Sequence, residues 1–131
     1  MPHIIVEYSA NLEEDADLAG LCNVLRACAA AQEIFPETGV RVRAIRCDIY
    51  SIADGDPENG FIDISVRLRE GRPLDKRKAA TEAIFEAAKN HLGDLVDRRP
   101  IMLSLEMRNI DAELAPKLNT VRDFIERKKN G

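Results

Sequence analysis

The chain has 131 residues, of which 45% are hydrophobic and 32% charged, and its formal net charge is -4. These proportions are typical of a globular domain, and the negative charge argues against nucleic-acid binding, which usually requires an excess of basic residues. No apolar run is long enough to cross a bilayer, and the N-terminus lacks the pattern of a signal peptide. We therefore expect one domain over residues 1–131, located in the cytoplasm, with no nucleic-acid or membrane partner.

The cysteines and the acidic loop do not indicate a metal site. Cys22, Cys28 and Cys47 form no C-x-x-C pair, and the first two fall on the apolar face of a predicted helix, which favours buried thiols in a reducing compartment. His91 also falls on an apolar helical stripe, so we interpret it as a packed residue. The loop starting at Asp54 lacks the glycine and the glutamate of a calcium loop. We expect no metal.

The first half of the chain predicts a strand, a helix and a second strand. Residues 2–9 alternate between apolar and mostly polar side chains, as in a strand with one buried face. The Asn-x-x-Glu segment at residues 11–14 resembles a capping box at the start of a helix, which Pro36 and Gly39 would end. A second strand is predicted over residues 40–45. The helix between them carries one apolar stripe: Leu18, Leu21, Cys22, Leu25, Cys28 and Ala29.

The second half repeats this order. Residues 61–68 alternate as a strand does, a helix is predicted to begin near Pro73 and to end at Pro100, and residues 101–107 alternate again. The connection over residues 54–60 is rich in turn-forming residues. The second helix also has one apolar stripe: Ala80, Ala83, Ile84, Ala87, Ala88, His91, Leu92 and Leu95.

Two strand–helix–strand units predict an α+β fold with a four-stranded mixed sheet and two helices on one face. The repeat units cover about residues 2–50 and 61–108, and a C-terminal extension over residues 109–131 carries a short helix that begins near Asn119. The other face of the sheet would be bare. We expect other subunits to cover it, because we judge its side chains too apolar for water.

Pro2 is a candidate general base. A small residue after Met1 favours removal of the initiator, which would leave Pro2 with a free secondary amine. Burial or nearby cations lower the pKa of such an amine, so that it can accept a proton near neutral pH. Taken alone, Pro2 is more simply interpreted as the start of a strand, where its missing N–H does no harm. The catalytic interpretation depends on the rest of the chain.

Three arginines are candidates for binding an anion. Arg41 and Arg43 are two residues apart at the start of a predicted strand, so both point to one face. Arg72 precedes Pro73 and lies beside a predicted helix N-terminus, which itself attracts anions. Surface arginines commonly have no function, yet few features of this chain require cations at these positions for stability. Because a guanidinium matches a carboxylate in a bidentate manner, we expect a small polycarboxylate substrate.

Pro2 at the start of a strand, the repeated units and Gly71-Arg72 before the second helix together resemble the tautomerase superfamily, and within it the 5-carboxymethyl-2-hydroxymuconate Δ-isomerases. The resemblance covers nearly the whole chain, and it depends on the order and spacing of segments rather than on one specific motif. The segments that carry it are residues 2–9, 34–36, 39–41, 53–55, 71–72 with Arg77, and 103–106.

The resemblance implies a homotrimer with its sheets packed at the centre. It also implies a cofactor-independent isomerase that moves a proton between carbons of an unsaturated 2-hydroxy or 2-oxo polycarboxylic acid of aromatic catabolism, with 4-hydroxyphenylacetate degradation as one such pathway. Carried over by position, Pro2 is the base, Arg72 stabilises the dienolate and Arg41 binds a carboxylate. Arg43 stands beside Arg41 as a further substrate-binding residue. Because Arg43 and Arg46 add positive charge beside Arg41, the number and placement of acid groups on the substrate are left open.

Two other interpretations stay open at this stage. A tautomerase or a dehalogenase-type lyase acting on another small acid would use the same proline. A trimeric binding module of the same fold would leave the proline idle. Turnover of simple enol acids such as phenylenolpyruvate would separate an enzyme from a binding module.

Overall fold

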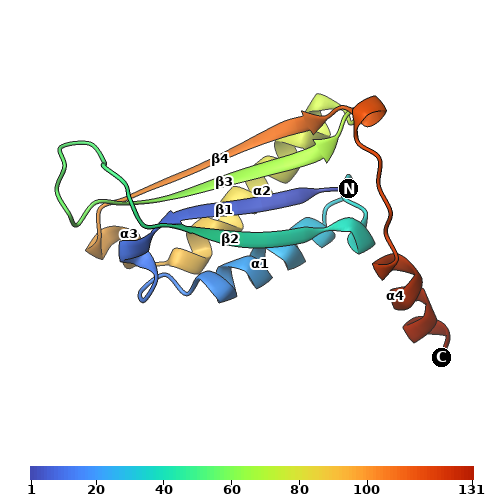
Figure 1. Cartoon of the computed structure of the whole chain (residues 1–131), viewed down its shortest axis with the longest axis horizontal. Coiled ribbons are helices and arrows are strands. Elements are labelled where there is room, and N and C mark those ends of the chain that lie inside the picture. The colour runs from blue at the N-terminus through green and yellow to red at the C-terminus, as the bar shows by residue number, and fades with distance from the viewer.

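Two strand–helix–strand units form one four-stranded sheet in the computed structural model, which describes residues 1–131 (Figure 1). The first unit consists of β1 (His3–Ser9), α1 (Leu18–Ala30) and β2 (Arg41–Cys47), and the second of β3 (Gly60–Arg69), α2 (Leu74–Leu92) and β4 (Ile101–Ile110). The shorter elements are the 3-10 turns η1 (Ala10–Leu12), η2 (Glu37–Gly39) and η3 (Ala112–Leu114) and the helices α3 (Leu95–Arg98) and α4 (Val121–Asn130).

The sheet is mixed, with the strand order β2-β1-β3-β4. Each unit pairs its two strands in parallel, and the central strands β1 and β3 join the units in an antiparallel manner. The predicted fold class, two repeated units in a mixed sheet with two helices on one face, is confirmed.

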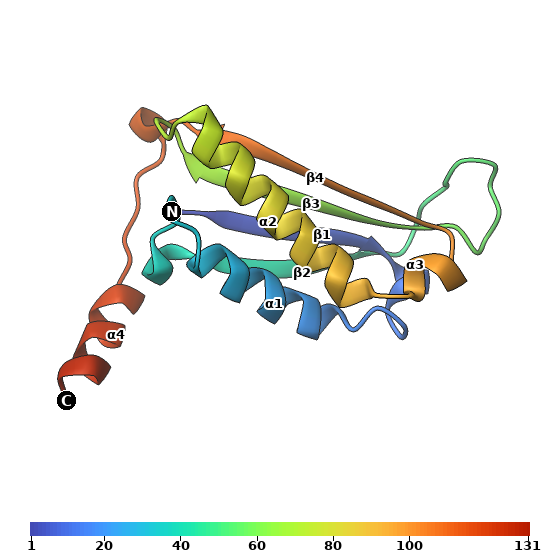
Figure 2. The same ribbon diagram turned by 180° about the vertical axis from the view of Figure 1, so that it is seen from behind.

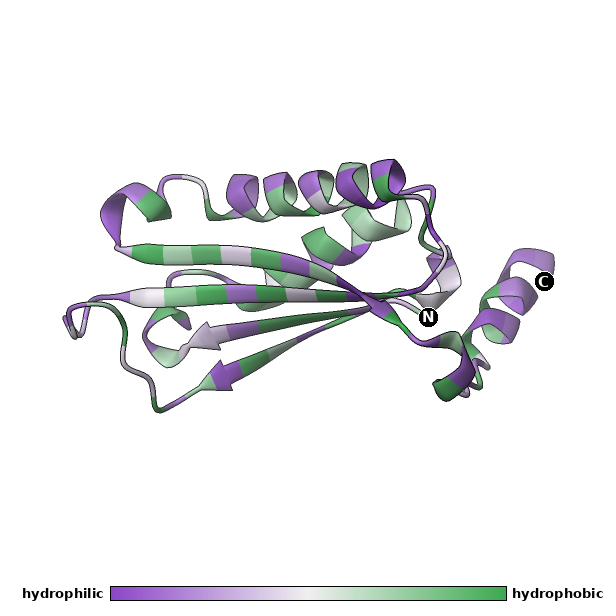
Figure 3. Ribbon diagram, turned by 90° about the horizontal axis from the view of Figure 1, so that it is seen from above, coloured by the Kyte–Doolittle hydropathy of each residue, from purple (hydrophilic) through white to green (hydrophobic).

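Helices α1 and α2 cover one face of the sheet, and no helix covers the other (Figures 2 and 3). The period of two in a strand sends every second side chain toward the helices, and those residues make up the core. Burying each large aliphatic side chain contributes roughly 1.5–3 kcal/mol. The fully buried ones from the central strands and the helices are Ile4, Val6, Ile62, Ile64, Val66, Leu21, Leu25 and Ile84.

The bare face of the sheet is less apolar than the sequence analysis expects. Its large apolar side chains are Ile5, Ile45, Phe61 and Met102, because the register turns most aliphatic strand residues toward the helices. Basic residues gather at the end of the sheet where β1 and β2 begin. Phe61 and Met102 lie near the other end, where β3 and β4 begin. The polar and charged members of this face are His3, Glu7, Arg41, Arg43, Asp63, Ser65, Arg67, Ser104, Glu106 and Arg108.

The predicted boundaries of the first helix are wrong at both ends. α1 begins at Leu18, where the carboxylate of Asp17 accepts a hydrogen bond from the backbone N–H of Gly20 at 3.1 Å. The side-chain amide of Asn11, the predicted cap, donates instead to the carbonyl of Asn59 at 2.8 Å and so ties η1 to the loop before β3. The helix ends at Ala30, well before Pro36.

The second helix is also shorter than predicted. α2 begins at Leu74, and it ends at Leu92 because Gly93 takes a positive φ of 56° that stops the helical path. The short α3 then fills the space before Pro100. The C-terminal helix agrees better with the prediction, since the side-chain carbonyl of Asn119 accepts from the N–H of Arg122 at 3.2 Å just before α4.

One edge of the sheet gathers both predicted site segments and the C-terminal extension. β1 and β2 begin at this edge, and β3 and β4 end there, because β1 and β3 are antiparallel. Figure 1 shows the N-terminus at this edge, the loop before β3 at the far edge, and the segment after β4 passing the N-terminus on its way to α4. None of the helices combines the length and the apolar character needed to cross a membrane.

Candidate active site

Pro2 lies fully buried at the start of β1, so the backbone rather than solvent fixes its ring. The turn η2 forms one wall around it. A Cβ added to Gly39 would lie 3.3 Å from Cδ of Pro2 and 3.4 Å from Cγ of Pro36, so a side chain at this position would press on the proline ring. Both β1 and η2 therefore hold Pro2 in place.

Arg41 lies at the start of β2, directly beside β1. One of its guanidinium nitrogens donates to the carbonyl of Gly39 at 3.1 Å, and the other contacts Nε2 of His3, its partner in the parallel register. Burial and the charges of Arg43 and Arg67 lower the pKa of the Arg41 guanidinium. Two acceptors thus hold a half-buried cation next to the N-terminus.

Arg43 points to the same bare face as Arg41, as predicted, but it lies one step farther from the N-terminus. Its guanidinium is 3.5 Å from Nδ1 of His3. Burial together with Arg41, Arg67 and Arg43 lowers the pKa of His3 to about 4. His3 was not predicted as a site residue. The signal for it is its position opposite Arg41 in the parallel register, with Arg43 two residues farther along β2 on the same face.

Arg72 lies half-buried in the turn between β3 and α2, and the structure brings it to the same edge as Pro2 and Arg41. Burial, followed by the positive charges of Lys117, Arg41, Arg72 and Arg69, lowers the pKa of the amino group of Met1. Cations near an amine disfavour its protonated form. The N-terminus therefore lies in a positive field built from several elements.

Two of these cations were not predicted from the sequence. Arg69 ends β3, and Lys117 lies in the C-terminal extension, far along the chain from every other site residue. The extension is held at this edge by Asn119, whose side-chain amide donates to the carbonyl of Thr38 at 3.0 Å. No pattern in the extension reveals this contact, because it depends on where β4 ends.

Three hollows adjoin the N-terminus, and Met1 is the one residue common to all of them. The first, of about 290 Å³, is lined by η2 and the extension. A second, of about 170 Å³, lies between Arg69 and Lys117. The third, of about 360 Å³, includes Arg41 and Asn119. Met1, which directly precedes Pro2 in the chain, therefore borders all three spaces.

Other candidate features lie away from this edge. A larger hollow of about 490 Å³ between α2 and β4 contains none of the predicted site residues, and its charges are of mixed sign. His91 is half-buried, and its Nε2 donates to the carbonyls of Ala16 and Asp17, which fits its interpretation as a packed residue. The thiols of Cys22 and Cys28 are free and half-buried rather than fully buried, and burial raises their pKa.

Comparison with known proteins identifies the family. The sequence pattern of the 5-carboxymethyl-2-hydroxymuconate isomerase family matches residues 2–125. The chain belongs to this family. A 5-carboxymethyl-2-hydroxymuconate Delta-isomerase of Escherichia coli is 37% identical over 121 residues, which are 92% of this chain and 96% of that protein. The predicted membership of the tautomerase superfamily and the predicted isomerase class are confirmed.

Solved structures of the same isomerase family superimpose closely on the chain. A crystal structure of a 5-carboxymethyl-2-hydroxymuconate delta-isomerase matches with a TM-score of 0.88 at 26% identity, over 95% of this chain and 93% of that chain. An isomerase from Deinococcus radiodurans R1 matches with the same score of 0.88 at 28% identity and the same coverage, 95% and 93%. A protein described as a Q0 fused 4-OT wild type symmetric trimer shares the fold, with a TM-score of 0.64 at 22% identity over 89% of this chain and 92% of that chain.

Proposed function

We propose that this member of the isomerase family moves a proton between carbons of an unsaturated 2-hydroxy or 2-oxo polycarboxylic acid, of the 5-carboxymethyl-2-hydroxymuconate type, in the cytoplasm and without a cofactor. The observation that carries the proposal is the edge of the sheet where a buried Pro2 lies among four cations that have no carboxylate partner. These are Arg41, Arg69, Arg72 and Lys117, whose positive charges all act on the amino group at the N-terminus.

Removal of Met1 turns Pro2 into the base. With Met1 present, the nitrogen of Pro2 is an amide and has no basic lone pair. The burial and the positive charges that lower the pKa of the Met1 amine would act in the same direction on the neighbouring Pro2 amine once Met1 is removed. The amine of processed Pro2 is therefore neutral near physiological pH. It takes a proton from one carbon of the substrate and returns it to another.

The arginines bind the anion and stabilise the charge that develops in the reaction. Loss of the first proton leaves a dienolate, and preorganised donors lower the barrier by stabilising its negative charge. We assign this role to Arg72. Arg41, fixed by Gly39 and His3, binds a carboxylate, and Arg43 extends the positive surface on the bare face of the sheet.

We also infer that three copies of the chain assemble through the bare sheet faces. A sheet that carries Ile5, Ile45, Phe61 and Met102 on an uncovered face has apolar surface to bury, and its basic and acidic groups can pair between copies. The resemblance to the tautomerase superfamily supports the number three.

The test compares two forms of the protein that differ only at the N-terminus. The processed form begins with Pro2, and the other keeps Met1 behind a short tag, both verified by mass spectrometry and circular dichroism. We expect the processed form to isomerise 5-carboxymethyl-2-hydroxymuconate, with a rate that rises with pH as the Pro2 amine loses its proton. The tagged form should be folded but slower by roughly 10²–10⁴-fold, the usual contribution of a general base. Equal activity of the two forms would rule out Pro2 as the base.

A further inference from the structure

Residues 112–119 of the C-terminal extension cross the edge of the sheet in front of the N-terminus, and we call them the strap. The strap is fixed at both ends. The backbone N–H of Ala112 donates to a carboxylate oxygen of Glu70 at 3.1 Å, and the side-chain amide of Asn119 donates to the carbonyl of Thr38 at 3.0 Å. Figure 2 shows this segment descending past the N-terminus between the end of β4 and α4. It is therefore a wall of the candidate site with a defined path.

The strap carries Lys117, whose ammonium group is exposed and forms no ion pair. Lys117 and Arg69 are the only charged residues of the hollow of about 170 Å³ that adjoins Met1. The rest of its lining is uncharged: Met1, Ile110, Ala112, Ala115 and Pro116. The volume is several times the roughly 30 Å³ that a water molecule occupies in the liquid, so the hollow has room for a carboxylate.

Arg41 and Lys117 line different hollows beside the N-terminus. Arg41 lines the hollow of about 360 Å³, which shares only Met1 with the hollow of about 170 Å³ between Arg69 and Lys117. Lys117 also lines the hollow of about 290 Å³, which has lining residues in common with both. Two unpaired positive groups thus face separate spaces that border Met1. An extended molecule that replaces Met1 in front of Pro2 meets a cation at each end, and it gains from both only if it carries an anionic group at each end.

We propose that Lys117, with Arg69, is a specificity-determining site for the distal carboxylate of the substrate, so that the enzyme selects acids with two or more separated carboxylates over monocarboxylates. The proposal rests on the proposed function for the placement of the reacting carbons beside Pro2. Arg41 anchors the proximal carboxylate, and Lys117 recognises the second one across the site. The strap is then the element that sets the substrate class.

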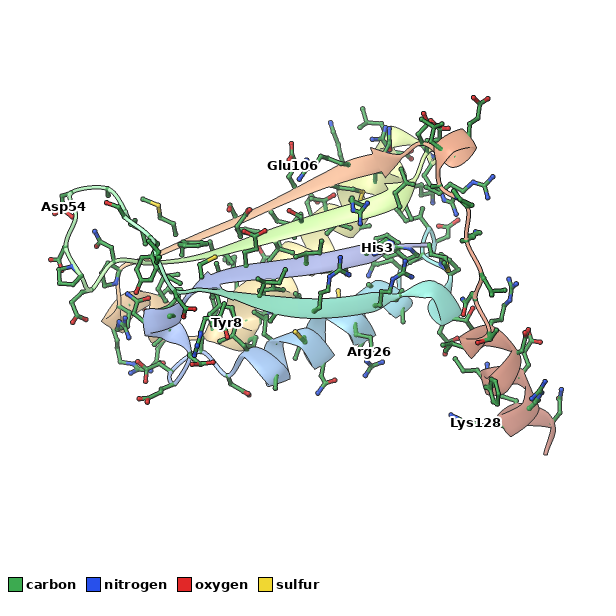
Figure 4. All side chains as sticks on the ribbon, in the orientation of Figure 1. His3, Tyr8, Arg26, Asp54, Glu106 and Lys128 are labelled. Carbon is green, nitrogen blue, oxygen red and sulfur yellow. The ribbon has the colours of Figure 1, made fainter.

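The experiment separates recognition from turnover by using two inert acids with the same six-carbon diene skeleton. Muconate carries a carboxylate at each end, and sorbate carries only one. Calorimetric affinities for both acids are measured with processed wild type, Lys117→Gln and the control Lys128→Gln, whose lysine lies near the C-terminal end of α4, away from the sheet (Figure 4). We expect wild type and Lys128→Gln to bind muconate more tightly than sorbate. Lys117→Gln should weaken muconate binding about tenfold, the loss of one charge-assisted hydrogen bond, and leave sorbate binding unchanged.

Kinetics provide the second measurement. With 5-carboxymethyl-2-hydroxymuconate, Lys117→Gln should raise KM about tenfold while kcat changes little, and phenylenolpyruvate turnover should be unaffected. Asn119→Ala, which releases one end of the strap, should shift KM in the same direction. If the ratio of muconate affinity to sorbate affinity is the same in Lys117→Gln as in wild type, the proposal is overturned even when the enzyme is active. A changed ratio in a protein without isomerase activity would support this site while contradicting the proposed function.

Discussion

The contact between His3 and Arg41 helps to fix the position of the Arg41 guanidinium, the group that we propose binds a substrate carboxylate. A ring nitrogen of histidine accepts a hydrogen bond only when that nitrogen carries no proton. Arg41 can therefore keep its contact with Nε2 only while His3 is neutral, and the lowered pKa of about 4 keeps it neutral through the physiological range. His3 is thus a positioning residue for Arg41.

Replacing His3 should separate its hydrogen-bond role from its protonation. His3→Gln retains an acceptor for Arg41, whereas His3→Ala does not, so only the alanine variant should raise KM for a carboxylate substrate, by about three- to tenfold. The stability of the wild type should fall as pH drops from 6.5 toward 4, because the unfolded chain binds a proton at His3 that the folded chain does not. Urea midpoints measured over this range should fall less in His3→Gln. Parallel curves for the two proteins would contradict this role.

The two principal arginines should differ in which kinetic constant they affect. Arg72→Ala should lower kcat, since stabilising the dienolate matters only once charge has developed. Arg41→Ala should raise KM as well, since a carboxylate anchor acts in the ground state and in the transition state. Each loss of transition-state stabilisation should be about 2–4 kcal/mol. Steady-state kinetics of both variants near wild type would place the substrate elsewhere.

At the level of elements, η2 packs against the Pro2 ring at Gly39, which has no side chain to displace it. Gly39→Ala would bring a Cβ to 3.3 Å from the proline ring and 3.4 Å from Pro36, so the ring must shift by a few tenths of an ångström. We expect kcat to fall several-fold with a stability loss of about 1 kcal/mol or less, because the change affects alignment more than packing. Gly55→Ala, in the loop at the far edge, is a control for activity. A normal kcat in Gly39→Ala would show that the wall does not align Pro2.

The elements also show what the sequence could and could not predict. Alternation and helical periodicity correctly predict the strands and the two long helices, because both patterns report directly on one buried face. The cap of α1 was missed because Asp17 is in a left-handed conformation at the end of an irregular segment, while Asn11 serves the loop contact with Asn59. Lys117 was missed because its place at the site depends on two hydrogen bonds that tie the extension to residues far away in the sequence. Ala112 is bonded to Glu70, and Asn119 is bonded to Thr38.

At the level of the whole molecule, we predict a homotrimer in solution. Light scattering at micromolar concentration should give three times the chain mass of 14.6 kDa, which is about 44 kDa. Ile45, on the bare face, is 46% exposed in the single chain, and Ile49, in the following loop, is 96% exposed. Ile45→Asp should therefore weaken the assembly, and Ile49→Asp should not. A 14.6 kDa species for the wild type would contradict this prediction.

The two units of the sheet are alike in topology, but only one of their central strands begins at a chain terminus. β3 starts at Gly60, whose nitrogen is an amide that donates to the carbonyl of Pro100 at 2.9 Å, and Leu12 fills the space beside it. At that far edge the cation Arg99 is paired with Asp15 at 2.8 Å, whereas the cations around Pro2 are unpaired. Under the proposed mechanism, carrying both units in one polypeptide therefore fixes the stoichiometry at one reactive amine per chain. The proposed trimer of six strand–helix–strand units would have three catalytic ends and three purely structural ones.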